Sequence, residues 1–194
     1  MELVGGIFIM EKFKTERNDY GYMSSKSTIR QDGMRDQLDW IKRQLEYYAF
    51  AEKYNLRYDL KQGEIYEFDW GINVNAEFSN RHYGVVLADS DIFNPLVTVC
   101  PLKTNHGGAH PKSDVDLGFV VELNSTKSTL AVVNQIRTLD KLRMYTRRAI
   151  GLCDGSNKHD QNDYNKMIVM RLENEKLNMI KQAYIKYLSG ETTK

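Results

Sequence analysis

The pattern of apolar and polar residues is clearest over residues 33–55. Apolar side chains recur there at intervals of three and four, the spacing of one helix face, and charged residues fall mostly between them. The apolar positions are Met34, Leu38, Ile41, Leu45 and Tyr48. The pattern predicts an amphipathic helix about six turns long, within an N-terminal extension assigned to residues 1–58. Its apolar face would pack on its own domain or a partner protomer; the alternative is a docking helix for another protein.

Residues 59–190 show short β-type runs separated by polar turns. The expected strands cover 64–70, 83–88, 96–100, 119–123, 130–133 and 167–172. A helical pattern follows at 173–188, with Gly190 just beyond its end. We expect a long polar loop at 103–116 and a polar insertion at 145–165. Many short strands with few helices between them predict an α+β protein, mainly β, with a small, strongly bent antiparallel sheet or barrel.

The first of these runs, Glu64 to Trp70, alternates in a way typical of a strand. Tyr66, Phe68 and Trp70 fall on one face because successive strand residues point to opposite sides. The sequence therefore predicts a half-buried strand whose aromatic face lies toward the core.

Composition and charge narrow the class of protein. The chain has 194 residues, of which 41% are hydrophobic and 27% charged, so a disordered chain is excluded. Its 27 basic and 26 acidic residues leave a formal net charge of +1, and any attraction to nucleic acid must come from a local patch. Cys100 and Cys153 show no disulfide pattern; we expect reduced, buried thiols in a cytoplasmic protein.

Two segments carry a more specific signal. The first contains Gly63-Glu-Ile-Tyr, a loop from Gly71 to Glu77, and a strand through Val85-Val-Leu-Ala88. The second is Asn134-Gln-Ile-Arg-Thr-Leu-Asp-Lys-Leu-Arg-Met144. Together with Val99-Cys-Pro-Leu102 they resemble the MazF/PemK family of toxin endoribonucleases, whose Q-I-R-T-I-D-K-x-R-L signature residues 133–144 match almost letter for letter. The resemblance covers about residues 61–190.

This resemblance implies a fold and an activity. The fold would be an SH3-like small barrel of the MazF/PemK/CcdB type, with a C-terminal helix and here an N-terminal helical extension. The activity would be metal-independent cleavage of single-stranded RNA, with no cofactor, in a groove across a homodimer. A cognate antitoxin whose extended tail occupies that groove would be the protein partner.

The family usually places an arginine before a proline in its second strand. His82 and Tyr83 stand at those two places here, and Arg81 comes one residue earlier. A histidine near its ordinary pKa can both accept and donate a proton, whereas arginine supplies only charge and hydrogen bonds. We therefore expect His82 to be the acid/base group and Arg81 to contact phosphate. Because they are neighbours on a strand, the two should face opposite ways.

Three further residues are candidates by position in the family pattern. Lys103 and Thr104 follow Pro101-Leu102, where the family has a threonine or serine. Lys103 would place positive charge near the phosphorane and Thr104 would offer a hydroxyl. Glu77 matches the family's loop glutamate and would act as a base or orient a cationic neighbour. Each of the three could instead be an ordinary surface residue.

The densest basic cluster follows the signature and predicts an RNA-binding track. Its members are Lys141, Arg143, Arg147 and Arg148. For Arg137, inside the signature, we expect a structural or interface role.

His106 and His110 are four residues apart, but Gly107, Gly108 and Pro111 exclude a helix there, so we expect no metal site. Two other functions stay open from sequence alone. One is a catalytically inactive SH3-like module that binds nucleic acid or protein. The other is a toxin that poisons a topoisomerase, as CcdB-like relatives do, against which the intact signature argues.

Overall fold

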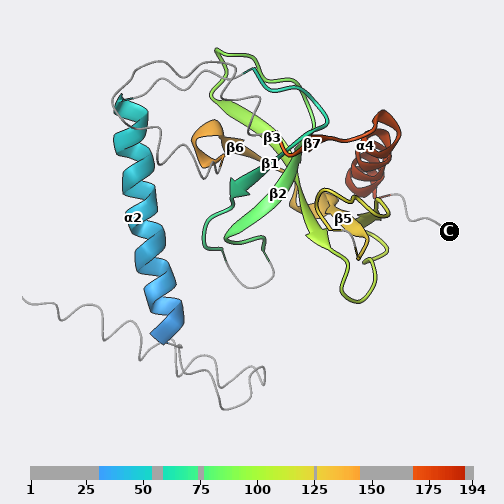
Figure 1. The fold of residues 1–194 in the computed structure, drawn as a ribbon, viewed down its shortest axis with the longest axis horizontal. Helices are drawn as coiled ribbons and strands as arrows, with labels where there is room; N and C mark the ends of the chain where they lie inside the picture. The colour runs from blue at the N-terminus through green and yellow to red at the C-terminus, as the bar shows by residue number, and fades with distance from the viewer. Residues whose placement is uncertain (1–30, 54–58, 74–76, 125, 145–167, 191–194) are drawn as a thin grey trace, which may run out of the picture. The chain divides into compact units, whose positions relative to one another are not determined.

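The computed structural model describes residues 31–53, 59–73, 77–124, 126–144 and 168–190 (Figure 1). Residues 1–41 and 42–194 form two compact units. The predicted amphipathic helix is present as α2, Gln31–Lys53. Most of the expected extension before it, and the polar insertion at 145–165, lie outside the described residues. The predicted boundary at residue 58 therefore stays a prediction.

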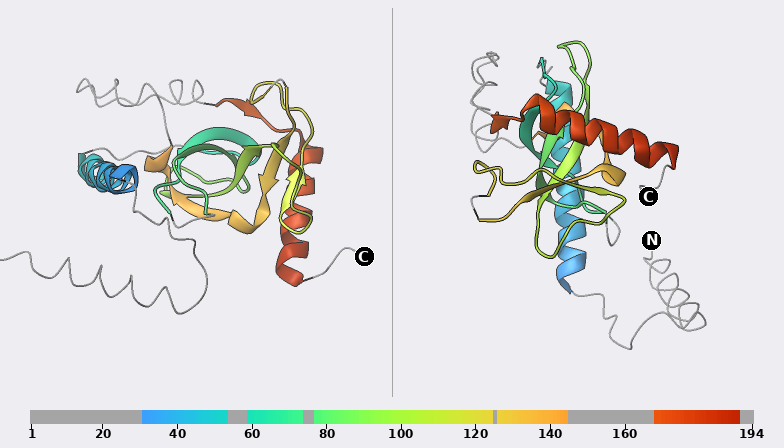
Figure 2. Two further views of the ribbon diagram at one scale, coloured as in Figure 1. Left: turned by 90° about the horizontal axis from the view of Figure 1, so that it is seen from below. Right: turned by 90° about the vertical axis from the view of Figure 1, so that its right-hand side faces the viewer.

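One curled antiparallel sheet forms the second unit (Figure 2). Its strands are β1 Glu64–Asp69, β2 Arg81–Val86, β3 Leu96–Thr104, β4 Asp114–Asp116, β5 Thr129–Val132, β6 Arg137–Asp140 and β7 Met170–Arg171. The order across the sheet is β4-β5-β3-β2-β1-β7, and β6 also pairs with β3. Helix α4, Asn174–Ser189, packs against this sheet and ends at Gly190, which is left-handed. The expected α+β class with a small, mainly β barrel is confirmed.

The central strand, β3, has two partners along one edge. Its first half pairs with β6 and its last residues with β5, while β2 lies on the opposite edge. Between β5 and β6 the chain makes a single 3₁₀ turn, η1, at Val133–Gln135. The register against β3 shifts by three residues across this turn. The turn thus releases Gln135 from the ladder, and β6 resumes pairing at Arg137.

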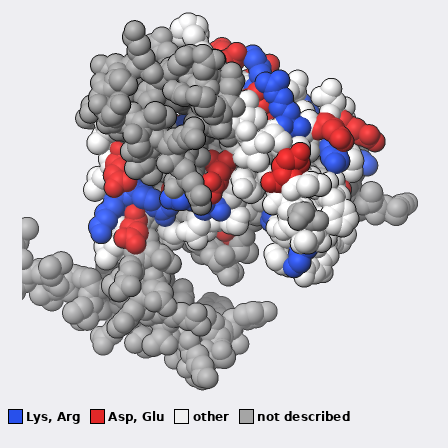
Figure 3. Space-filling view, viewed as in Figure 1, with Lys and Arg blue, Asp and Glu red and all other residues white. Residues whose placement is uncertain are grey.

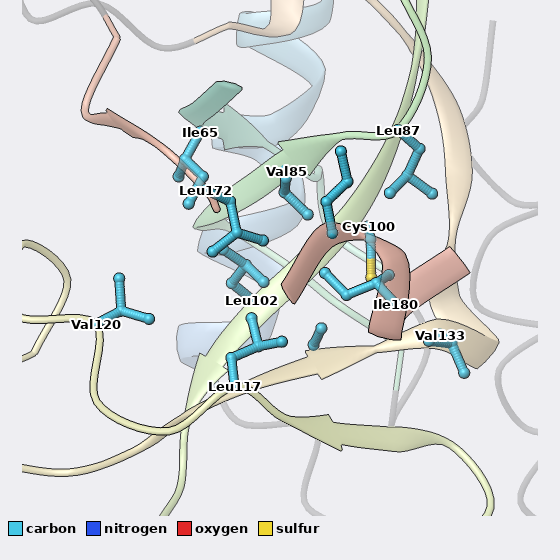
Figure 4. Packing of buried hydrophobic residues seen from close by; sticks show 12 residues of the cluster. Ile65, Val85, Leu87, Cys100, Leu102, Leu117, Val120, Val133, Leu172 and Ile180 are labelled. Carbon is cyan, nitrogen blue, oxygen red and sulfur yellow. The ribbon is translucent and has the colours of Figure 1, made fainter. Parts of the chain in front are cut away.

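Both faces of the sheet are buried in its centre. Ile65, Val85, Cys100 and Leu102 point to one face, where Ile180 of α4 packs against them (Figure 4). Other residues form a second cluster on the opposite face, namely Leu60, Tyr66, Phe68, Trp70, Val86, Val97, Val99, Leu139 and Met144. Strand β1 therefore contributes to both clusters, and the expectation that it is only half-buried is wrong. The buried Cys100 agrees with its expected role as a small hydrophobe, whereas Cys153 lies outside the described residues.

Three segments differ in secondary structure from the sequence prediction. Residues 119–123, expected as a strand, form a turn in which Val120 is buried while Phe119 and Val121 are exposed. Strand β4 lies inside the expected polar loop at 103–116, and β6 lies inside the signature. Both strands are short and carry charged residues, so their pairing is imposed by neighbouring strands rather than by an apolar pattern.

The close packing of the second cluster can be tested at Gly84. A Cβ atom there would come within 3.0 Å of the Phe68 ring and 3.1 Å of the Trp70 ring. Both rings are fully buried and cannot move aside without disturbing their neighbours. We expect Gly84→Ala to lower the free energy of unfolding by about 1–3 kcal/mol in urea denaturation.

The matched control is Gly107→Ala, because a Cβ atom at Gly107 would meet nothing within 4 Å. An equal loss of stability in the two variants would show that the glycine backbone matters at position 84 and the packing does not.

Candidate functional site

The connection between β1 and β2 is held by residues of the signature segment. The backbone N–H of Phe78 donates to Gln135 Oε1 at 2.6 Å. Arg137 donates through one guanidinium nitrogen to the Trp70 carbonyl at 2.7 Å and to the Phe78 carbonyl at 3.4 Å. Its guanidinium also lies 4.8 Å from the centre of the Trp70 ring. The signature thus fixes both ends of the β1–β2 connection, in agreement with the structural role expected of Arg137.

Hydrogen bonds among its own residues also join the two ends of this connection. Trp70 N–H donates to the Asn80 carbonyl at 2.8 Å, and Asn80 N–H donates to the Gly71 carbonyl at 2.6 Å. Asn80 takes a positive φ of 63°, a conformation that asparagine tolerates better than most residues. The Asn73 side chain adds donors to the Trp70 and Phe78 carbonyls, at 2.9 and 2.5 Å. This hairpin end is therefore fixed immediately before β2 begins.

A buried carboxylate holds the first residue of the connection. Asp69 accepts from the Gly71 N–H at 3.0 Å through one oxygen. Its other oxygen accepts from Arg43 at 2.9 Å and from the Tyr47 hydroxyl at 2.8 Å. Burial, together with the neighbouring Asp69 carboxylate, raises the pKa of Tyr47, so the phenol stays a donor. The C-terminal half of α2 is thereby linked to the strand end that precedes the connection.

His82 lies at the start of β2 with its ring against this connection. The ring centre is 4.9 Å from that of Phe78, edge to face, and the His82 carbonyl accepts from the Trp70 indole N–H at 3.1 Å. Partial burial lowers the pKa of His82, although a backbone hydrogen bond with Ser79 and the charge of Glu67 act in the opposite direction. The imidazole is therefore neutral at pH 7 and able to accept a proton.

Arg81 and His82 face opposite sides of the sheet, as their positions on the strand predicted. Gly84, which shares its face with His82, packs against Phe68 and Trp70 of the second cluster, whereas Val85, which shares its face with Arg81, belongs to the first. Both residues are exposed. Glu77 is exposed at the end of the connection, and its charge raises the pKa of Arg137 against the lowering caused by burial and by Arg143.

Lys103 and Thr104 lie at the end of β3, just beyond its ladder with β2. The last pair of that ladder is Gly84↔Pro101. His82 and Lys103 each lie two residues past it, so alternation places them on the same face at the same end of the strands. Thr104 lies on the opposite face, with Arg81. The structure therefore divides four of the five candidate catalytic residues between two faces, with His82 and Lys103 on one face and Arg81 and Thr104 on the other.

Sequence reasoning missed the partner of Lys103. The Lys103 ammonium donates to Asp114 at 2.8 Å, and the Asp114 side chain is only 2% exposed. Burial would raise the pKa of Asp114, but hydrogen bonds from Lys103 and from the His110 backbone outweigh it and lower the pKa. The carboxylate therefore stays charged and forms an ion pair with Lys103. Asp114 lies in β4, inside the segment expected to be a loop, where the single apolar residue Val115 gives no pattern that predicts a strand.

The predicted basic track needs correction at Lys141. Its side chain is 2% exposed, and the ammonium donates to the Asp91 carbonyl at 2.7 Å and the Ser90 carbonyl at 3.2 Å. A group enclosed in this way cannot contact a phosphate. Arg143 is half-buried. Arg147 and Arg148 lie outside the described residues, so their RNA binding stays a prediction.

Metal-ligating groups form no second site in the part of the chain that the structure describes. On the face in Figure 3, basic and acidic side chains are interspersed over the described residues. No three His, Cys, Asp or Glu side chains of those residues are grouped to hold a metal ion. His110 lies 3.0 Å from the Ser113 hydroxyl, and His106 lies 2.9 Å from the Lys127 ammonium. None of the described helices has the length and apolar character needed to cross a bilayer.

Comparison with known proteins decides the family. The family model for the PemK-like, MazF-like toxin of type II toxin–antitoxin systems matches residues 61–160. The chain belongs to this family. The match spans the β1–β2 connection, β3 and the signature, which are the elements that build the site.

Solved structures add two similar folds to the family assignment. One is a crystal structure of MazF from Deinococcus radiodurans, and the other is an endoribonuclease in complex with its cognate antitoxin from a mycobacterial species. Each is 14% identical, covers 69% of this chain and 99% of its own, and superposes with a TM-score of 0.43. No curated protein matches the sequence. The assignment to the toxin family rests on the family model.

The structural role of Lys141 in this toxin can be tested by Lys141→Met. The change keeps the length of the side chain but leaves two backbone carbonyls without their ammonium donor. Because hydrogen bonds to a charged group contribute more than neutral ones, we expect a loss of about 1–3 kcal/mol in the free energy of unfolding. Chemical denaturation measures it. A stable variant that loses RNA affinity and part of its salt dependence would instead restore Lys141 to the RNA-binding track.

Proposed function

We propose that this chain is a toxin that cleaves single-stranded RNA without a metal ion, using the ribose 2′-hydroxyl as nucleophile. Membership of the PemK/MazF-like toxin family supports the general function. The observation that carries the mechanism is the shared face of His82 and Lys103 at the end of β2 and β3. An imidazole that accepts a proton and an ammonium on the same face supply the base and the positive charge that an attack on a phosphodiester requires.

The proposed reaction is an exchange at phosphorus. His82 takes the proton of the 2′-hydroxyl, the 2′-oxygen bonds to phosphorus, and the bond from phosphorus to the 5′-oxygen breaks. The leaving 5′-oxygen receives the proton from His82, which returns to its neutral form. Lys103 stabilises the negative charge that develops on the phosphorane oxygens.

The other candidates have supporting roles. Arg81 and Thr104 lie on the opposite face from His82, and we assign them to contacts with the RNA backbone on either side of the scissile bond. Glu77 is exposed close enough to Arg137 for their charges to interact. We assign Glu77 to orienting cationic groups around the β1–β2 connection, whose position the signature residues fix.

Metal independence gives the first test of this function. Purified protein in EDTA should cut single-stranded RNA and leave a 2′,3′-cyclic phosphate or 3′-phosphate together with a 5′-hydroxyl, because the 2′-oxygen forms the new bond. Mass spectrometry of the fragments identifies these ends. Activity that appears only after a divalent ion is added would exclude the mechanism.

His82 should carry the proton transfer. We expect His82→Ala to lower the rate of cleavage by about 10²–10⁴-fold, the usual contribution of a positioned acid/base group. Because partial burial lowers the pKa of His82 from its ordinary value of 6.5, kcat/KM of the wild type should rise with pH through an inflection below 6.5. Quenched single-turnover assays over a range of pH measure the cleavage rate of the variant and the pH dependence of the wild type.

The matched variant is Arg81→Ala, one residue earlier and on the other face. It should mainly weaken RNA binding and reduce the dependence of that binding on salt. If Arg81→Ala abolishes cleavage while His82→Ala is nearly normal, the family's usual arginine is at position 81 and our assignment of the base is wrong.

Assembly and partner follow from the same proposal. We propose a homodimer, because one small barrel offers only half of a groove for RNA, and a cognate antitoxin that competes for that groove. The apolar face of α2 adds a second reason, since Leu45 and Tyr48 are 64% and 73% exposed on it. Sedimentation at micromolar concentration should give the mass of a dimer; a monomer would contradict this assembly.

A second candidate is an inactive module that binds RNA or protein through the same face. It is favoured by one observation, that Lys103 is held by Asp114 at the position where the family has a hydroxyl residue. The two candidates differ in one measurement: the module binds single-stranded RNA in EDTA and leaves it intact.

A further inference from the structure

A polar hollow opens on the surface beyond the end of β3. Its volume is about 690 Å³, within the range of small-ligand sites. It is lined by side chains of the segment that follows β3 and of residues 116–128, including Asn105, His106, Asp116, Phe119, Lys127 and Ser128. None of these residues was expected from the sequence to bind RNA.

The hollow and the candidate catalytic face are connected by one row of paired residues across β3, β5 and β4. Lys103 pairs with Leu130, and Leu130 pairs in turn with Asp116, so Lys103 and Asp116 lie in one row and on one face. Immediately after Thr104, the Asn105 N–H donates to the Ser128 carbonyl at 2.9 Å. A strand of RNA that reaches Lys103 therefore meets the hollow next.

One wall of the hollow presents a cation and a fixed hydrogen-bond donor. The Lys127 ammonium lies 2.9 Å from His106 Nδ1. Because an ammonium can only donate, Nδ1 must be the acceptor, and the ring proton lies on Nε2. The pair thus offers positive charge and a second N–H, which suit a phosphate group.

Two other residues that line the hollow suit a nucleobase. The Phe119 ring, which lines the hollow, is 63% exposed, two residues after the buried Leu117. An exposed aromatic ring of this kind is a platform on which a nucleobase stacks. Asp116 accepts from the Gly118 N–H at 2.8 Å and the Ser128 hydroxyl at 3.2 Å, and a carboxylate has lone pairs left for the amino edge of a base. Its negative charge keeps phosphate on the Lys127 side.

We propose that this hollow binds one nucleotide of the single-stranded RNA, with its base stacked on Phe119 and its phosphate at Lys127 and His106. The proposal rests on the proposed function and deepens it, because it assigns a subsite beside the scissile bond. A hollow for a protein segment would instead need a continuous apolar surface, and here five of the six named side chains are polar or charged.

The test is the affinity of the full chain for a short single-stranded oligonucleotide of mixed sequence with fluorine in place of each 2′-hydroxyl, which cannot be cleaved. Fluorescence anisotropy measures Kd. We expect Phe119→Leu to weaken binding by about 5- to 150-fold, the range found for loss of one base–aromatic stack. Phe119→Tyr keeps the ring and should restore binding. Lys127→Met should weaken binding and make the slope of log K against log salt shallower by about 0.7.

The matched controls are Phe93→Leu and Lys186→Met, which change an exposed aromatic and an exposed cation elsewhere. Both should bind the oligonucleotide as the wild type does. Binding by Phe119→Leu that equals the wild type would overturn the subsite, even if that variant binds an antitoxin peptide less well.

The two proposals fail in different ways. If the wild type cleaves RNA and Phe119→Leu has normal affinity, the subsite is wrong and the endoribonuclease function stands. If the wild type binds the oligonucleotide through Phe119 but cleaves no RNA, the subsite stands and the catalytic proposal is wrong. A wild type that does not bind RNA overturns both.

Discussion

The structure depends on how the end of the β1–β2 hairpin is held. In this connection the Phe78 N–H and the Trp70 and Phe78 carbonyls lie outside the strand ladder, so their hydrogen bonds must come from side chains. Gln135 and Arg137 supply them from the far side of β3, by accepting from Phe78 and donating to Trp70 and Phe78. Because His82 packs on Phe78 and its carbonyl bonds to Trp70, the same contacts fix the proposed base.

The three-residue turn η1 makes this support possible. Without it, β5 would continue in register along β3 and the signature would lie in the ladder as an ordinary strand. The turn releases Gln135 and shifts β6, so that Arg137 lies opposite Val99, on the face of the second cluster, with its guanidinium over Trp70. A residue type suited to binding phosphate is thereby used to close a core, and the cations that we propose contact RNA are Arg81, Lys103 and Lys127.

Sequence alone was sufficient for the parts governed by pattern. The helix α2, five strands of the barrel and α4 follow from apolar periodicity, and the family follows from the signature. The sequence alone was insufficient where neighbouring strands decide the conformation of a segment. Strands β4 and β6 have no apolar alternation of their own, and the Val120 segment forms a turn despite its β-branched residues. The burial of Lys141 and the Asp114 partner of Lys103 depend on contacts across the sheet, which no local pattern reveals.

Gln135 and Arg137 of the signature hold the hairpin end on which the position of His82 depends. The most direct measurement is amide hydrogen exchange of Phe78 together with RNA cleavage, in the wild type and in Gln135→Ala. We expect a slowly exchanging Phe78 amide in the wild type. In the variant we expect faster exchange of Phe78, unchanged exchange of Val85 in β2, and a lower cleavage rate. A variant whose Phe78 amide exchanges freely while RNA is cleaved at the wild-type rate would contradict it.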